Sequence, residues 1–244
     1  MKWNRLLFAA LGIAGCDSGE SSTVLTSGDL NPSTVSAATV EGPLNILAIG
    51  DSALRWNEGE STVAQLGNVL AEAGVTHTVQ NNSVNGATLG CGEEGVGTAD
   101  NCIPPQFESG SWTHVLVSGG GNDILESDCS VSADAILTAD LQNGRLIPLL
   151  DTITETGAEI LLYGYFHPGD ANSPVWGCEP VFQLLERYRS LAEQTDGIWF
   201  IDGRDVITPE EPAGYADELH PSPAGSRKLA EYIAQSMNWV ELND

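Results

Sequence analysis

The sequence predicts an α/β fold in which a parallel sheet of about five strands is covered by helices on both faces. Two observations predict it. Apolar runs of strand length alternate with longer amphipathic stretches, as is typical of β-α-β units whose crossovers place helices on both faces of a sheet. The chain has 244 residues, of which 41% are hydrophobic, so it can bury one full core, and we expect a single folded domain.

The expected elements follow from residue periodicity. Strands are expected where short runs are apolar, and helices where apolar residues recur every three or four positions, as Leu229, Ile233 and Met237 do. Gly74 marks the end of the first helix. The expected strands are residues 45–49, 76–81, 113–118, 159–165 and 198–201, the expected helices are residues 61–73, 132–156, 180–196 and 223–237, and residues 90–110 and 167–178 are expected to be long loops.

The first sixteen residues have the pattern of an export signal. Two basic residues precede an apolar stretch too short to span a bilayer, and the Ile-Ala-Gly-Cys run ending at Cys16 resembles a bacterial lipobox. This resemblance implies an exported protein anchored to a bacterial membrane only through a lipid on Cys16, and an ordinary secretory signal is the alternative. Residues 17–43, rich in Ser, Thr, Gly and Asn, are expected to be a flexible tether, and residues 44–244 the folded domain.

Four cysteines remain in the expected domain. An exported compartment is oxidising, so we expect two disulfides, and the short separations favour Cys91 with Cys102 and Cys129 with Cys178 among three possible pairings. The sequence has no C-x-x-C and no H-x-x-x-H, so the cysteines are expected to be structural and no metal is expected.

The charge of the chain argues against one class of partner. The sequence has 34 acidic and 9 basic residues, for a net charge of -25. This charge repels phosphate backbones, so nucleic acid is not expected to bind. We expect a monomer.

A serine follows the first expected strand, in the run Gly50-Asp51-Ser52. Ser and Asp at such a strand-to-helix junction also act as ordinary helix caps. A serine at this place can instead be a nucleophile, with its backbone N–H facing a developing oxyanion. The loops after the second and third expected strands leave the sheet at the same edge, where open parallel sheets bind ligands.

Asp217 and His220 lie just before the last expected helix, at a spacing that lets their side chains touch. The carboxylate would hold the imidazole in the tautomer that takes a proton from serine. The alternative is that Asp217 caps the helix and His220 is an ordinary surface residue. His167 is another candidate base, but it lacks a carboxylate at a paired spacing, although Asp170 is near.

Gly86 and Asn122 are candidate donors to an oxyanion, through a backbone N–H and a side-chain amide. Taken singly, each also fits ordinary turn chemistry, because Asn-Gly and Gly-Asn pairs are common in turns.

Together these residues resemble the four sequence blocks of the SGNH hydrolases, also called the GDSL lipases and esterases. The resemblance runs from about residue 46 to the C-terminus, and four short blocks in order are far more specific than one. Ala53 and Leu54 depart from the leucine that the family usually has next to the serine. The blocks are Gly50-Asp51-Ser52, Gly86, Gly120-Gly121-Asn122-Asp123 and Asp217-x-x-His220.

The resemblance implies a flavodoxin-like three-layer α/β/α sandwich and a serine esterase. It implies Ser52 as nucleophile, His220 as base with Asp217 as its partner, and the Ser52 amide, Gly86 and Asn122 as oxyanion donors. Carboxylic esters would be hydrolysed through an acyl-serine intermediate, without metal or cofactor. The blocks do not distinguish acyl or acetyl esters of lipids, small alcohols and carbohydrates, although disulfide-closed loops favour a short acyl chain.

Three other interpretations fit less well. The sequence has no G-x-S-x-G, which an α/β-hydrolase would show, and Gly119-Gly120-Gly121 is not the dinucleotide-binding G-x-G-x-x-G. The alternative from another class is a non-catalytic, surface-anchored carbohydrate-binding module on the same fold. Its candidate sugar-stacking side chains are Trp56, Trp112, Trp176 and Tyr165.

Overall fold

The computed structural model describes residues 34–37, 42–92, 100–169 and 173–243. The expected export signal, with Cys16, and most of the expected tether lie outside the described residues. Within the described ranges, no helix has both the length and the apolar character needed to cross a membrane.

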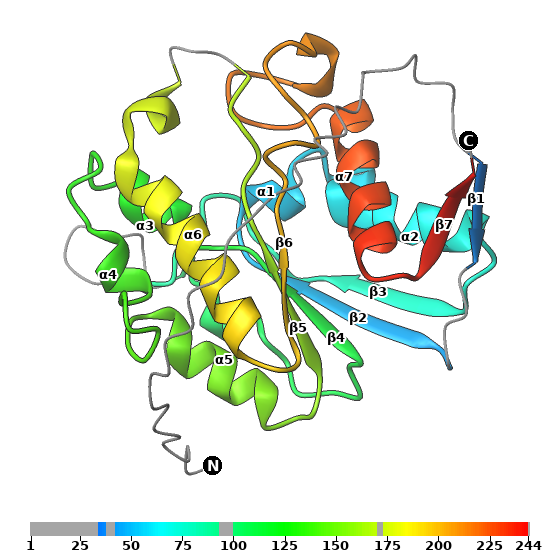
Figure 1. Cartoon of the computed structure of the whole chain (residues 1–244), viewed down its shortest axis with the longest axis horizontal. Coiled ribbons are helices and arrows are strands. Elements are labelled where there is room, and N and C mark those ends of the chain that lie inside the picture. The colour runs from blue at the N-terminus through cyan, green and yellow to red at the C-terminus, as the bar shows by residue number, and fades with distance from the viewer. Residues whose placement is uncertain (1–33, 38–41, 93–99, 170–172, 244) are drawn as a thin grey trace, which may run out of the picture. The chain divides into compact units, whose positions relative to one another are not determined.

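A parallel five-stranded sheet forms the centre of the fold, as the sequence predicts (Figure 1). Its strands are β2 (Leu44–Ile49), β3 (His77–Asn81), β4 (His114–Val117), β5 (Glu159–Tyr163) and β6 (Ile198–Ile201). The spatial order is β3-β2-β4-β5-β6, and every neighbouring pair is parallel. The winding therefore reverses between β2 and β4, and in open sheets of this type the ligand crevice lies at that reversal, outside the carboxyl ends of the strands.

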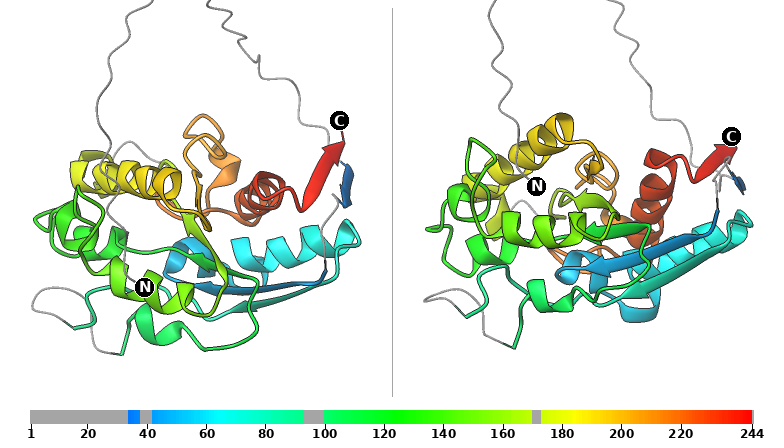
Figure 2. Two further views of the ribbon diagram at one scale, coloured as in Figure 1. Left: turned by 60° about the horizontal axis from the view of Figure 1, so that its bottom comes forward. Right: turned by 90° about the horizontal axis from the view of Figure 1, so that it is seen from below.

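Helices cover both faces of this sheet (Figures 1 and 2). The helices α2 (Thr62–Glu72) and α7 (Pro223–Ser236) pack on one face, and α5 (Leu146–Thr154) and α6 (Glu179–Gln194) pack on the other. Successive residues of a strand alternate between the two layers: Val115 and Val117 belong to the core with α5 and α6, and Leu116 to the core with α2 and α7. Burial on both faces explains why the central strands β2, β4 and β5 are mostly apolar, whereas the edge strand β3 is largely polar.

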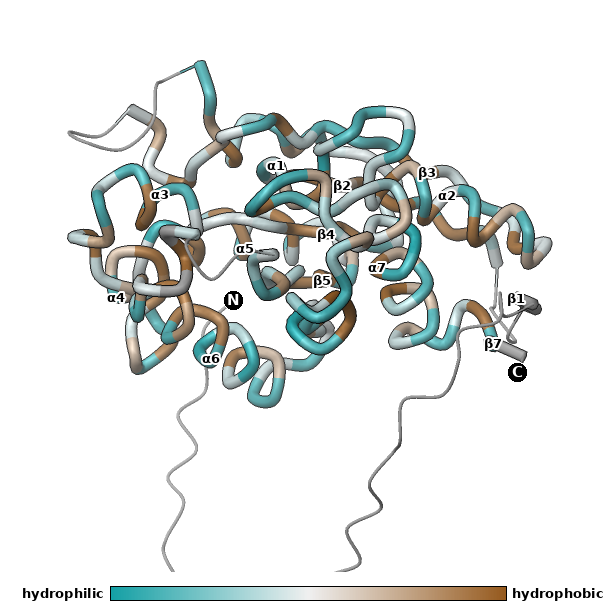
Figure 3. The backbone as a smooth tube through the Cα atoms, turned by 90° about the horizontal axis from the view of Figure 1, so that it is seen from above, coloured by the Kyte–Doolittle hydropathy of each residue, from teal (hydrophilic) through white to brown (hydrophobic). Residues whose placement is uncertain are grey.

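Helices such as α6 bury only one side. Residues of α6 alternate between hydrophilic and hydrophobic along the tube in Figure 3, and its apolar side packs into the core. The buried residues of this helix are Val181, Leu184, Leu185, Tyr188 and Leu191.

One expected helix is divided. The sequence predicts a helix over residues 132–156, and this prediction is wrong because the chain turns back between α4 (Ala133–Ile136) and α5. Gly144 lies in that turn at φ +113°, where an added Cβ would come within 2.3 Å of the carbonyl oxygen of Ile136. The remaining short helices are α1 (Ser52–Arg55) and α3 (Gly121–Leu125), with the 3-10 turns η1 (Glu58–Glu60), η2 (Pro104–Gln106), η3 (Pro174–Gly177) and η4 (Pro212–Gly214).

A small second sheet is not predicted by the sequence. The strands β1 (Thr34–Ala37) and β7 (Val240–Asn243) pair antiparallel, with Ala37 opposite Val240. β1 falls within the stretch expected to be a tether. A four-residue strand carries little periodicity of its own, and its backbone partners come from the other end of the chain.

The end of β2 approaches β4 more closely than any side chain would allow. Gly50 has φ +142°, and an added Cβ would lie 2.2 Å from Ser118 Oγ. Both backbone groups of Gly50 pair with the side chain of Gln106: the N–H donates to Oε1 at 2.6 Å, and Nε2 donates to the carbonyl at 3.0 Å. These contacts fix the direction in which Asp51 and Ser52 leave the sheet.

Gly50→Ala is expected to lower the free energy of unfolding by about 2 to 4 kcal/mol, because it adds strain at a positive φ and a steric overlap with Ser118. Urea denaturation followed by circular dichroism measures the change. Gly59→Ala is the matched control, since Gly59 is exposed and its added Cβ would meet nothing within 4 Å. Equal stability of the two variants would contradict the close approach.

Candidate active site

Three of the predicted residues, Ser52, Asn122 and His220, meet at the carboxyl edge of the sheet. Ser52 begins α1 directly after β2, and Asn122 lies in α3 after β4. Both line one pocket together with His220, which comes from the segment that precedes α7. The pocket therefore sits at the reversal of winding between β2 and β4.

Ser52, His220 and Asp217 form a continuous hydrogen-bonded chain. His220 Nε2 lies 3.1 Å from Ser52 Oγ, and His220 Nδ1 lies 2.9 Å from Asp217 Oδ2. When Nδ1 carries the proton that the carboxylate accepts, the lone pair of Nε2 faces the serine hydroxyl. The arrangement can take a proton from Ser52 and hold it on the imidazole.

Asp217 is fixed by its own turn. Its Oδ1 accepts the backbone N–H groups of Leu219 at 2.8 Å and His220 at 2.7 Å. Partial burial acts to raise the pKa of Asp217, but the hydrogen bonds from the His220 backbone, its ring and the Leu219 backbone outweigh it and lower the pKa below the ordinary value. The capping alternative is wrong, because Ser222 caps α7.

The segment that follows Ser52 holds the histidine from the other side. The indole of Trp56 stacks on the His220 ring, with the two centroids 3.7 Å apart and the planes 7° from parallel. Beside it, the side chain of Asn57 donates a hydrogen bond of 2.8 Å to the carbonyl of Pro221. The end of α1 and the histidine segment are thus joined by one ring contact and one hydrogen bond.

Asp51, the residue before Ser52, is 2% exposed, so its carboxylate is buried. It accepts hydrogen bonds from the N–H of Ala53 at 3.0 Å, the hydroxyl of Ser118 at 2.9 Å and the hydroxyl of Tyr165 at 2.6 Å. The Tyr165 oxygen in turn accepts the backbone N–H of Gly121 at 2.9 Å. Burial raises the pKa of Asp51 despite these hydrogen bonds.

The three expected oxyanion donors are placed by neighbouring loops. Asn122 donates one amide hydrogen to the carbonyl of Ala87 at 3.0 Å, which sets it beside Gly86 and leaves its second hydrogen available. Gly86 stands in a turn closed from the Ala87 N–H to the Val84 carbonyl, at φ +73°. Among the described residues, no hydrogen bond is formed by the backbone N–H of Gly86 or of Ser52.

Asp123, the last residue of the third block, has a structural role. Its buried carboxylate accepts the backbone N–H groups of Leu89 at 2.9 Å and Gly90 at 2.8 Å, and lies 3.4 Å from Arg145. It therefore ties the loop that carries Gly86 to α3.

The alternative base His167, its neighbour Asp170 and the cysteines do not line the pocket or lie partly outside the described residues. His167 does not line the pocket, and its carbonyl accepts the hydroxyl of Tyr215 at 2.7 Å. Asp170 lies outside the described residues. Cys129 and Cys178 form a disulfide, with their Cα atoms 5.6 Å apart.

The expected bridge between Cys91 and Cys102 stays a prediction. Cys91 is exposed and Cys102 is buried. The loop between the two cysteines includes residues 93–99, which lie outside the described part of the chain.

Comparison with known families shows the family to which the chain belongs. A model described as the GDSL-like Lipase/Acylhydrolase family matches residues 48–228. The chain belongs to this family. The match begins in β2 and ends within α7, so it includes all four blocks of this GDSL-like hydrolase.

Solved structures of low sequence identity share its fold. A lipolytic protein of the G-D-S-L family from Veillonella parvula DSM 2008 is 16% identical with a TM-score of 0.58, over 79% of this chain and 97% of that one. An acetyl-xylooligosaccharide esterase from Geobacillus Stearmophilus, solved as a variant, is 19% identical with a TM-score of 0.58, over 82% and 97%. A psychrotrophic esterase from Pseudoalteromonas sp. is 19% identical with a TM-score of 0.56, over 79% and 96%. Comparison with curated proteins found no match.

Sequence reasoning missed several residues of the site in this GDSL-like hydrolase. The sequence indicates Tyr165 and Trp56 only as candidate sugar-stacking side chains. The place of Tyr165 after β5, at the same edge as the other loops, is a signal for the site. Gln106 gave no signal, because its role depends on a long loop that folds back against Gly50.

The pKa of Asp217 predicts a pH dependence of stability. Because this pKa is lower in the folded protein than in the unfolded chain, the ionised carboxylate stabilises the fold above roughly pH 4 and loses this contribution as the pH falls through the lowered pKa. The difference in free energy of unfolding between the parent and Asp217→Asn, measured by urea denaturation, should be present at about pH 6 and shrink by about pH 3. A difference that grows at acid pH would refute the sign.

Trp56→Leu is expected to lower kcat on an acyl ester about five- to tenfold with little change in KM, because the ring loses the aromatic face that orients it and attracts its protonated form. Trp56→Phe, which keeps a face, should retain most of the rate. Steady-state kinetics of both variants and the parent measures kcat and KM. Equal kcat for Trp56→Leu and the parent would show that the stacking has no part in turnover.

Proposed function

We propose that this protein is a serine esterase that hydrolyses carboxylic esters with short acyl groups through an acyl-serine intermediate. The observation that carries the proposal is the hydrogen-bonded chain from Ser52 through His220 to Asp217. Membership of the GDSL-like family supports it, since the three residues belong to the blocks that define the resemblance.

The proposed reaction has two halves. Ser52 Oγ attacks the ester carbonyl while His220 Nε2 takes its proton, and His220 then gives this proton to the departing alcohol. Water releases the acyl group in the second half, with His220 again acting first as base and then as acid. Asp217 keeps the proton of His220 on Nδ1 throughout.

The negative oxygen that forms in each half needs donors. The backbone N–H groups of Ser52 and Gly86 and the second amide hydrogen of Asn122 are the groups that we assign to it. The network under Asp51 supports this assignment, because it connects the start of α1 with the backbone beside Asn122.

The size of the pocket supports a short acyl group. Its volume is about 40 Å³, which is room for roughly three water-sized groups. An acetyl group fits this space. The similarity to an acetyl-xylooligosaccharide esterase is consistent with acetyl esters of carbohydrates as one substrate class.

Ser52→Ala is expected to lower kcat/KM for p-nitrophenyl acetate and for acetylated xylan by about four orders of magnitude or more, leaving the rate that binding and the oxyanion donors supply. Ser190→Ala is the matched control, since Ser190 lies on α6 and does not line the pocket. A fluorophosphonate probe should label the parent and the Ser190→Ala protein but not the Ser52→Ala protein.

The same labelling separates the esterase from a carbohydrate-binding module. A binding module would leave the probe unreacted and would hydrolyse neither ester. Two of the candidate sugar-stacking side chains already contact residues of the site. Trp56 stacks on His220, and the Tyr165 hydroxyl donates a hydrogen bond to Asp51.

A further inference from the structure

Two of the segments that line the pocket next to Ser52 are far apart in the sequence, and we call them its two walls. One wall is Leu125, the last residue of α3, and the other is formed by Val175 in η3 and Val181 in α6. All three pack into the core cluster that also holds Cys129 and Cys178. Ala53, Phe166 and Leu219 also line the pocket, so the position of these two walls sets part of the space for an acyl chain.

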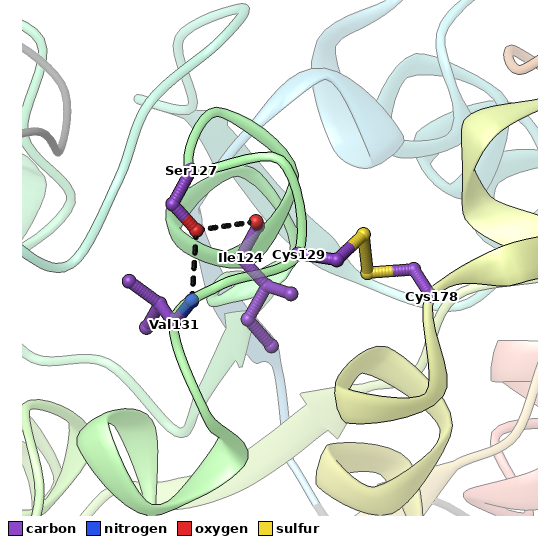
Figure 4. Close-up of a disulfide and its surroundings, with 5 residues drawn as sticks. All are labelled: Ile124, Ser127, Cys129, Val131 and Cys178. Atoms are coloured by element: carbon purple, nitrogen blue, oxygen red, sulfur yellow. Dashed lines mark hydrogen bonds between the residues drawn. A yellow bond between two sulfur atoms is a disulfide. The ribbon is translucent and has the colours of Figure 1, made fainter.

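The disulfide joins the two walls directly. Cys129 follows Leu125 by one short loop, and Cys178 stands between Val175 and Val181 and is completely buried. In Figure 4 the bridge spans from the loop after α3 to the start of α6.

Hydrogen bonds tie the loop that carries Cys129 to the end of α3. Ser127 Oγ donates to the carbonyl of Ile124 at 2.7 Å and accepts the N–H of Val131 at 3.0 Å (Figure 4). The N–H of Cys129 also donates to the Ile124 carbonyl, at 3.0 Å. The position of Cys129 is therefore coupled to the position of Ile124 and of the neighbouring Leu125.

The start of α3 is held in another way. The hydroxyl of Tyr188 donates to the carbonyl of Gly119 at 2.9 Å, and Gly120 packs so closely on α6 that an added Cβ would lie 2.7 Å from Leu184. Gly121 is bonded to Tyr165. None of these contacts involves the disulfide, so the backbone beside Asn122 is fixed without it.

Further along the chain, α4 is fixed to α6 by Arg187, which forms an ion pair of 2.9 Å with Asp134 and bonds the carbonyl of Leu137. Between Leu125 and Asp134, the covalent tie to α6 is the bridge from Cys129 to Cys178. The bridge therefore acts on the Leu125 side of the pocket and not on the donor side.

We propose that the Cys129–Cys178 disulfide sets the longest acyl chain that the enzyme accepts, by holding Leu125 against the wall of Val175 and Val181. Both cysteines are positioning residues, since they act through the pocket walls and not on the ester. The proposal rests on the proposed esterase activity and adds to it the element that determines chain length.

The test measures kcat/KM for p-nitrophenyl esters of two to sixteen carbons in the Cys129→Ala/Cys178→Ala double variant. One methylene in an apolar pocket changes discrimination about 10- to 200-fold. The ratio of hexanoate to acetate hydrolysis should therefore rise at least about tenfold over the parent, while the acetate rate stays within about threefold. Circular dichroism confirms the fold.

Two further variants sharpen the result. Cys91→Ala/Cys102→Ala removes the other two cysteines of the domain and should leave the ratio unchanged. Leu125→Ala shortens one wall with the bridge intact and should raise the ratio in the same direction.

An unchanged ratio in a folded double variant would overturn the proposal, and so would an equal fall of all ester rates or unfolding without the bridge. These outcomes are distinct from failure of the proposed function, which would appear as a parent protein without esterase activity or as an active Ser52→Ala variant.

Discussion

The buried carboxylate of Asp51 holds the site together. Its three donors come from α1, from the end of β4 and from the segment after β5. Through Tyr165 the network reaches the backbone of α3 at Gly121. Removing a carboxylate from water is unfavourable, and the three hydrogen bonds offset that cost only while every donor stays in place. One buried group thus couples the position of Ser52 to the backbone beside Asn122.

The segment that carries Asp217 and His220 is held by fewer buried contacts. The side chain of Asp217 is 42% exposed and that of His220 is 16% exposed, and both come from a segment between η4 and α7. This segment is held by the ring of Trp56, by Asn57 and by the turn that Asp217 itself closes. Ser52 therefore follows a buried carboxylate with three hydrogen-bond donors, whereas His220 is held by fewer contacts near the surface.

The central strands β2, β4 and β5 could be predicted because burial on both faces favours an apolar run that can be recognised without its neighbours. The expected helix over residues 132–156 failed because a turn through Gly144 depends on the close packing of that backbone against Ile136. The pairing of β1 with β7 failed for a similar reason, since each strand is too short to be recognised without its partner. The candidate roles of Ser52, Asp217 and His220 could be predicted from residue type, order and spacing, whereas the contacts of Gln106, Ser118 and Tyr165 that support them could not.

By itself the sequence determined the parallel sheet, the edge at which the loops gather and the residues able to do the chemistry, because these follow from local periodicity and from short spacings such as that of Asp217 and His220. Only the tertiary structure decided that Ser52 meets a histidine 168 positions away. It also decided the size of the pocket and the tie between its walls. Those features arise where segments distant in the chain pack against one another, and no local pattern of residues encodes the distance between them.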